Sequence, residues 1–250
     1  MVLAVIALTI VGVVSGPSNL TPTASPARSL ALPYTALPTS DVATEPASTP
    51  AHSVALPSPG TPMSVTDLLA TLKVAPEHRV GYDRDLFPQW IDADGDGCNT
   101  RYEVLIDEAV VAPTITGTCH LNGGSWLSPY DGVTLDDAAK VQIDHMVPLA
   151  EAWYSGAFAW TTERRQALAN DLDVPWTLVG VSGKTNEAKG SSDPASWLPP
   201  RRAAVCPYLD SWVAVKVRWG LTIDIDEKEA LTDRLADCPD TSLTVPIAAP

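Results

Sequence analysis

Residues 140–149 have the sequence KVQIDHMVPL, in which apolar and polar side chains alternate as far as Ile143. This alternation is typical of a β-strand with one buried face. The strand is followed by Asp144 and His145, whose side chains bind metal ions or transfer protons. Adjacent residues of a strand point to opposite sides, so one can bind a metal ion while the other faces a water molecule. The segment therefore predicts a strand that carries a reaction centre at its end.

The segments on either side of this strand favour an α+β fold. Residues 176–182, WTLVGVS, have the composition of a second strand. Ser64 and Asp67 have the spacing of a capping box, which predicts a helix that ends near Pro76. Asp226 is a suitable N-cap for the last helix. The other predicted helices cover residues 101–110, 149–157, 162–171, 184–190, 208–219 and 227–238.

The N-terminal quarter of the chain differs in composition from the rest. Residues 1–15 are apolar and uncharged, which indicates a signal peptide or an N-terminal apolar segment that stays as an anchor. Residues 16–62 are rich in Pro, Thr, Ser and Ala and predict a disordered linker. The folded domain is expected over residues 63–240, with a flexible tail over residues 241–250. This arrangement predicts a secreted or extracytoplasmic protein.

Four cysteines agree with an oxidising compartment. None of them forms a CxxC pair, so a zinc site made of four thiolates is disfavoured. We expect two disulfides, Cys98–Cys119 and Cys206–Cys238, because each pair closes a short local loop.

The charge balance argues against a dedicated nucleic-acid-binding protein. Outside the linker the chain has 15 basic and 28 acidic residues, a net charge of −13. Such a protein has no long-range attraction to a polyphosphate, so catalysis on nucleic acid needs local cations and a bound divalent metal. Arg201 and Arg202 form one of two basic doublets. Trp126 and Trp197, in predicted loops, are the candidates for base stacking.

Three residues downstream of the strand, Asn170, Asn186 and Lys189, complete a candidate centre for phosphodiester hydrolysis. This chemistry needs a base that activates water and cations that hold the phosphate. With Asp144, Asn186 can supply the oxygen ligands that Mg²⁺ prefers. Asn170 can hold the imidazole of His145 by its second nitrogen, which fixes its orientation. Lys189 is one helical turn beyond Asn186 and can reach the phosphate.

The segments IDHMVPLAEAW, AND and SGKTNEAKG together resemble the HNH, or His-Me finger, nuclease pattern in its His-Asn-Asn form. The chain is similar to secreted bacterial HNH-family proteins related to the C-terminal nuclease domain of GmrSD-type restriction enzymes. The resemblance extends over residues 80–238 and includes YDRDLF, SPYDG and DPASWLPP. Asn186 stands where many members carry His.

The resemblance implies a ββα-metal core with His145 as general base. Asp144 and Asn186 would bind one divalent ion, Mg²⁺ or Mn²⁺ or else Ca²⁺, and Asn170 would orient His145. The expected activity is an endonuclease for DNA, or alternatively RNA, without strong sequence preference. No stable protein partner is implied, and no membrane contact beyond the N-terminal segment.

Residues 92–103, DADGDGCNTRYE, also match the spacing of a calcium-binding loop. Its candidate ligands are Asp92, Asp94, Asp96 and Glu103. The alternative is a solvated acidic turn that directs Arg101 and Glu103 to the catalytic cleft, where Arg101 would take part in catalysis. A calcium-stabilised extracellular module without activity is accordingly the competing function. A metallopeptidase is disfavoured because HExxH does not occur.

Overall fold

The computed structural model describes residues 61–249, so the predicted apolar segment and nearly all of the predicted linker lie outside the described residues. Within residues 61–249 no helix combines the length and apolar character needed to cross a membrane.

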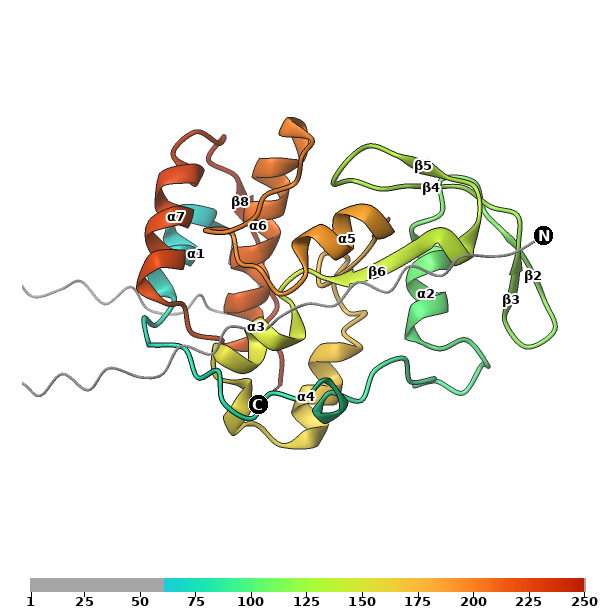
Figure 1. Ribbon diagram of the computed structural model, residues 1–250, viewed down its shortest axis with the longest axis horizontal. Coiled ribbons are helices and arrows are strands. Elements are labelled where there is room, and N and C mark those ends of the chain that lie inside the picture. Colours follow the sequence, from blue (N-terminus) through green and yellow to red (C-terminus); the bar gives the residue numbers. More distant parts are fainter. Residues whose placement is uncertain (1–60, 250) are drawn as a thin grey trace, which may run out of the picture. The chain divides into compact units, whose positions relative to one another are not determined.

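Helices and four two-stranded antiparallel sheets make up the described part of the chain, which confirms the α+β prediction (Figure 1). The helices are α1 (Val65–Thr71), α2 (Thr100–Asp107), α3 (Leu149–Tyr154), α4 (Thr162–Ala169), α5 (Gly183–Lys189), α6 (Arg202–Trp219) and α7 (Ile225–Leu235). The paired strands are β1 (Met63–Ser64) with β8 (Ser242–Leu243), β2 (Thr114–Thr116) with β3 (His120–Asn122), β4 (Trp126–Leu127) with β5 (Thr134–Leu135), and β6 (Val141–His145) with β7 (Leu178–Ser182).

The antiparallel pair of β6 and β7 positions the predicted centre. Asp144 pairs with Val179 and His145 with Leu178, so β6 runs two residues beyond Ile143. Helix α5 follows β7 directly and packs against both strands (Figure 1). Helix α2 packs on the face that carries Ile143, through a second apolar cluster. The strand pair is therefore held between two helices, while the outer edge of β6 has no strand partner within residues 61–249.

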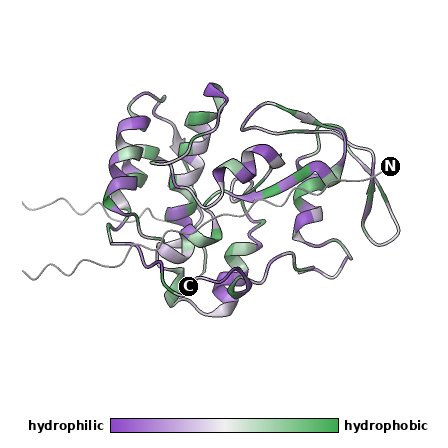
Figure 2. Cartoon of the chain, viewed as in Figure 1, coloured by the Kyte–Doolittle hydropathy of each residue, from purple (hydrophilic) through white to green (hydrophobic). Residues whose placement is uncertain are grey.

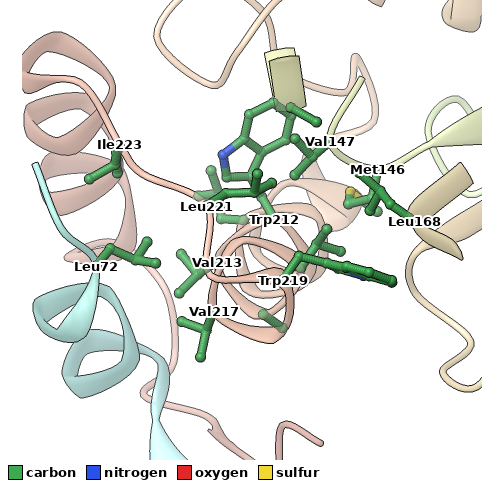
Figure 3. Close-up of a cluster of buried hydrophobic side chains, with 14 of the residues drawn as sticks. Leu72, Met146, Val147, Leu168, Trp212, Val213, Val217, Trp219, Leu221 and Ile223 are labelled. Atoms are coloured by element: carbon green, nitrogen blue, oxygen red, sulfur yellow. The ribbon is translucent and has the colours of Figure 1, made fainter. Parts of the chain in front are cut away.

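Helix α6 is the centre of the main hydrophobic core. Trp212, Val213 and Val217 on this helix are buried. Figure 3 shows Leu72 and Ile223 on one side of α6 and Met146 and Leu168 on the other. By contrast, α7 presents mostly hydrophilic residues in Figure 2. Because Met146 follows His145 directly, the core fixes the end of β6.

Several helix boundaries differ from prediction; for example, α1 ends at Thr71 rather than near Pro76. Helix α6 begins at Arg202 rather than near Tyr208, because it continues through Pro207. The N-cap of α7 is Asp224, whose carboxylate accepts the Glu227 amide, rather than Asp226. The cap of α1 is as predicted, since the Ser64 hydroxyl accepts the Asp67 amide at 3.1 Å.

Both predicted disulfides are confirmed. Cys98 is bonded to Cys119, with Cα atoms 5.1 Å apart, and Cys206 to Cys238, with Cα atoms 5.6 Å apart. The first bond joins the acidic loop to the β2–β3 hairpin, and the second joins α6 to the end of α7.

Residues 242–249, expected in a flexible tail, make defined contacts instead. Strand β8 pairs with β1 in a register that joins Met63 to Leu243. Val245 is buried, and Arg218 donates to the carbonyl of Pro246. The folded unit thus extends past residue 240, because its last strand closes against its first.

Candidate functional site

A cavity of about 350 Å³ opens at the unpaired edge of β6. Asp144 and His145 line it from β6, and Asn186 from α5. The other side is formed by α3 and by residues 82–84, which include Arg84. The structure therefore brings three of the predicted site residues to one cavity.

The imidazole of His145 is buried and oriented by a backbone carbonyl. Its Nε2 lies 3.0 Å from the carbonyl oxygen of Ala169. A carbonyl only accepts hydrogen bonds, so we assign the proton to Nε2 and the free lone pair to Nδ1. Within residues 61–249, no protein group hydrogen bonds to Nδ1. Burial lowers the pKa of His145 to about 4, against the effect of the Ala169 carbonyl, so the ring is neutral at neutral pH.

Asn170 does not hold the imidazole, contrary to the prediction. The preceding residue, Ala169, does so through its carbonyl. The Asn170 amide is used in four other hydrogen bonds: it accepts from Ile91 N and Thr100 Oγ1 and donates to the carbonyls of Pro88 and Gln166. The side chain therefore fixes the 88–91 loop to the end of α4.

Trp90, in this loop, lies against the imidazole. The two ring centroids are 5.8 Å apart, with an angle of 37° between the planes. The backbone of Trp90 has φ 61°, a left-handed conformation that is strained for a bulky residue. The four hydrogen bonds of Asn170 thus hold a strained residue beside His145. Nothing in the local sequence marks Trp90 for this role.

Asp144 is held in a buried cluster with Lys189 and Tyr130. Lys189 Nζ is 2.8 Å from Asp144 Oδ1, and Tyr130 donates to Asp144 Oδ2 at 2.8 Å. Lys189 also donates to the carbonyl of His145 at 2.9 Å. Burial raises the pKa of Asp144 and lowers that of Lys189, and the ion pair opposes both shifts. Lys189 is therefore an internal counter-ion for Asp144 and is not among the residues that line the cavity.

The cavity is lined by side chains whose oxygen atoms are of the kind that binds Mg²⁺. Asn186 donates its amide N–H to Gln142 Oε1 at 2.8 Å. Its Oδ1 accepts no hydrogen bond from residues 61–249. Glu187 lines the same cavity. A carboxylate has about four lone-pair positions, so Asp144 can accept from Lys189 and Tyr130 and still bind an ion.

Arg84 is the cation that sequence reasoning missed. It is exposed, lines the cavity and donates to Gln89 Oε1 at 2.9 Å. Its charge is close enough to lower the pKa of His145 further. The segment YDRDLF, which contains Arg84, is part of the family resemblance and was the available signal.

Arg101 does not face the cleft. It donates to the carbonyls of Ala138 and Val141, at 3.1 and 2.8 Å. Val141 is the first residue of β6 and His145 is its last, so Arg101 holds the opposite end of the strand. Of the two carbonyls that it contacts, one lies before β6 and the other belongs to the first residue of β6.

The acidic loop is exposed, and a helix follows it but does not precede it. Carboxylate oxygens of Asp92, Asp94 and Asp96 lie within 4.8 Å of one another, and Asp96 and Glu103 approach as closely. Asp92 also accepts two amides of the loop, from Gly95 and Gly97. These hydrogen bonds within the loop already shape the turn, and calcium binding here stays a prediction.

Comparison with known proteins identifies the family. The model of the GmrSD restriction endonuclease C-terminal domain matches residues 120–234, which include β6, β7 and α5. An uncharacterized secreted protein of Arthroderma benhamiae is 44% identical over 183 residues, covering 72% of this chain and 88% of that protein. No solved structure matches the chain. The matched family indicates a nuclease-type domain, and the chain belongs to the family of the GmrSD restriction endonuclease C-terminal domain.

Proposed function

We propose that the domain is a metal-dependent endonuclease that hydrolyses phosphodiester bonds, with His145 as general base. One observation carries this proposal: a neutral imidazole, with Nδ1 free of protein partners, borders a cavity that is lined by oxygen donors and Arg84. A base for water, an oxygen-ligand set and a cation for phosphate are the three components that this hydrolysis needs.

Each residue has a separate role in the proposed mechanism. Nδ1 of His145 takes the proton of the attacking water, while the Ala169 carbonyl keeps the ring in place. Arg84 binds the scissile phosphate, the role that the sequence had suggested for Lys189. Lys189 keeps Asp144 ionised and in position. A divalent ion held by Asp144 and Asn186 would supply positive charge to the phosphate oxygens.

The oxygen donor set fits a hard divalent cation such as Mg²⁺ or Mn²⁺. Asp144 on β6 and Asn186 on α5, the helix that follows β7, line the same cavity, which supports the proposal of a ββα-metal site. Because the described cavity contains no sequence-reading helix or basic arm, we propose cleavage of DNA or RNA without strong sequence preference.

We also propose export of the protein. The A. benhamiae relative is a secreted protein, and both disulfides need an oxidising compartment. The apolar residues 1–15 and the Pro-rich residues 16–62 would then be the export segment and the linker that precede the domain.

Plasmid degradation with and without EDTA tests this function. Wild-type protein should degrade plasmid with Mg²⁺ or Mn²⁺ and lose the activity in EDTA. Asp144→Ala should be inactive at low metal and recover in part at high metal, because the remaining oxygen ligands still attract an ion. His145→Ala should not recover, because added metal supplies no proton acceptor. Cleavage that is indifferent to EDTA would contradict the proposal.

A calcium-stabilised module without activity is the second candidate, favoured by the cluster of Asp92, Asp94 and Asp96. It predicts that Ca²⁺ raises the melting temperature of the wild type, but not of Asp94→Asn, and that no metal supports cleavage.

A further inference from the structure

A second cavity, of about 310 Å³, lies between the start of β7 and the start of α6. Trp176, Met146 and Tyr208 form apolar parts of its wall, and Arg201 stands beside them. The proposed hydrolysis uses none of these four side chains. The volume is at the low end of the range for small-molecule sites, about 300–1,000 Å³, and suits one nucleotide rather than a length of chain.

Arg201 is available for a ligand. It is exposed, and its side chain makes no hydrogen bond or ion pair within residues 61–249. Its Cδ lies only 3.5 Å from the position that a Cβ on Gly132 would take. Gly132 has φ 75°, which favours glycine, so the turn passes close under the arginine. A free guanidinium at an apolar cavity matches a ligand that is flat and apolar in one part and anionic in another.

Two further features make the cavity wall suitable for an aromatic ligand. Trp176 is only partly buried, so its ring is accessible for stacking. The Tyr208 hydroxyl is buried without a hydrogen-bond partner among residues 61–249. An unpaired buried hydroxyl is unfavourable unless a ligand or water satisfies it.

The tryptophans that the sequence suggested for base stacking are already engaged: Trp126 is buried, and Trp197, although only partly buried, packs against two tyrosines. Trp126 is buried in the second cluster, where its indole donates to the carbonyl of Leu105. Trp197 packs edge-on against Tyr130 and Tyr208. Trp176 is therefore the better stacking candidate.

The second cavity is linked to the reaction centre by one hydrogen bond. Tyr130 lines the second cavity, Asp144 lines the first, and the Tyr130 hydroxyl donates to Asp144 at 2.8 Å. Met146, on the second cavity, follows His145 directly. A nucleotide in the second cavity would thus be adjacent to the strand end that carries the base.

We propose that this cavity is a subsite for one nucleobase of the substrate strand, stacked on Trp176, with Arg201 contacting the phosphate of that nucleotide. The proposal rests on the proposed nuclease function and specifies its substrate as unpaired nucleic acid. A base reaches such a cavity only when it is out of the duplex stack, so single strands should bind best. Local recognition of this kind offsets the net charge of −13, which gives no general attraction to nucleic acid.

Arg201→Ala and Arg202→Ala form a matched pair for the test. Both remove one exposed positive charge, and only Arg201 lines the cavity. KM for cleavage of a short single-stranded oligonucleotide should rise about tenfold for Arg201→Ala, the loss of one charged phosphate contact, and less than about twofold for Arg202→Ala. Equal KM values for the two variants would overturn the subsite.

Trp176→Phe and Trp176→Ala test the stacking. The phenylalanine variant keeps a ring and should stay within a few-fold of wild type, whereas alanine should raise KM about tenfold or more. A series of oligonucleotides should be compared, each with one abasic position at a different distance from the cut. At one of these distances the abasic position should raise KM as much as Trp176→Ala does. That increase in KM should vanish in Trp176→Ala, and an increase that stays unchanged would contradict the proposal.

A binding measurement separates failure of the subsite from failure of the nuclease function. Fluorescence anisotropy of the labelled oligonucleotide on His145→Ala protein reports binding without cleavage. If wild type binds with Arg201 dependence but never cleaves, the nuclease function fails and the subsite stands. If wild type cleaves but binding depends neither on Arg201 nor on Trp176, the subsite fails and the nuclease function stands.

Discussion

Two buried lysines of this domain both pair with carboxylates, but they differ in the number of carboxylates and in whether a cavity lies beside them. Lys216, on α6, contacts the carboxylates of Glu151 and Glu227 at 2.9 and 2.6 Å, together with Ser155 and the carbonyl of Thr222. Lys189, on α5, contacts one carboxylate, that of Asp144, and the carbonyl of His145. Both side chains are completely shielded from solvent.

The pKa directions of the two lysines differ accordingly. Burial disfavours the charged form of each. At Lys216 the two carboxylates outweigh burial and raise the pKa, whereas at Lys189 burial outweighs Asp144 and lowers it. The first cluster is closed within the helical core, and the second borders a cavity. These contacts indicate that Lys216 serves stability; under the proposed function, Lys189 serves the carboxylate that would hold the metal ion.

Lys216→Met should give the largest loss of stability, about 3–5 kcal/mol of unfolding free energy, because it leaves two buried carboxylates without a counter-charge. Urea unfolding measures it. Lys184→Met, at an exposed position, is the control and should change the unfolding free energy by less than about 0.5 kcal/mol. A loss as small as that of the control would show that Lys216 does not hold the core together.

Lys189→Met should cost less, about 2–3 kcal/mol, because only one carboxylate loses its partner and this carboxylate borders the cavity. Added Mg²⁺ or Mn²⁺ should restore part of the loss by binding next to Asp144. The same metal should not help Lys216→Met. Equal recovery of both variants, or of neither, would remove the distinction between the two clusters.

The two asparagines of the predicted motif should separate in the same way. Asn170→Ala should destabilise the domain by about 2 kcal/mol, because it leaves four hydrogen-bonding partners unpaired. Asn186→Ala removes one recorded side-chain hydrogen bond and should cost less than about 1 kcal/mol, yet abolish metal-supported cleavage. Thermal unfolding and cleavage, measured on the same samples, test this; a stable but inactive Asn170→Ala would reverse the assignment.

Stability should also depend on pH through Glu227. Burial raises the pKa of Glu227 to about 7, against the effect of Lys216. The folded protein then keeps a proton that the unfolded chain releases near the ordinary glutamate pKa of 4.5, so the unfolding free energy should fall as pH rises from about 4.5 to about 7. Urea unfolding at pH 5 and pH 8 should show a shallower fall of the unfolding free energy in Glu227→Gln than in the wild type. A steeper fall in the variant would contradict this account.

The sequence was sufficient where structure depends on near neighbours. The alternation in β6, the Ser64 cap of α1 and the spacing of the cysteines predicted local features that the structure confirms. The resemblance also predicted that His145 and Asn186 belong to one site, and both line the same cavity.

The sequence was insufficient where a side chain has alternative distant partners. Lys189 and Arg101 carry the positive charge that a phosphate-binding residue needs. Only the folded chain shows that they already donate hydrogen bonds to oxygen atoms of the protein. Arg84 and His145 line the same cavity, and Asn170 holds the loop that follows Arg84 through a hydrogen bond to Ile91, 79 positions away in the sequence. A local sequence pattern gives no information about residues so far apart in the chain. The composition of the residues past 240 predicted a flexible tail. Their order comes from the pairing of β8 with β1, which lies at the other end of the domain sequence.

The most direct test of the central claim is the cleavage rate of His145→Ala beside His120→Ala, at saturating Mg²⁺ and with the fold checked by circular dichroism. His120 is exposed in β3 and outside the cavity, so it is the matched control. We expect His145→Ala to cleave about 10²–10⁴ times more slowly than wild type, and His120→Ala to stay within about twofold. A well-folded His145→Ala protein that cleaves at the wild-type rate would show that this imidazole is not the base.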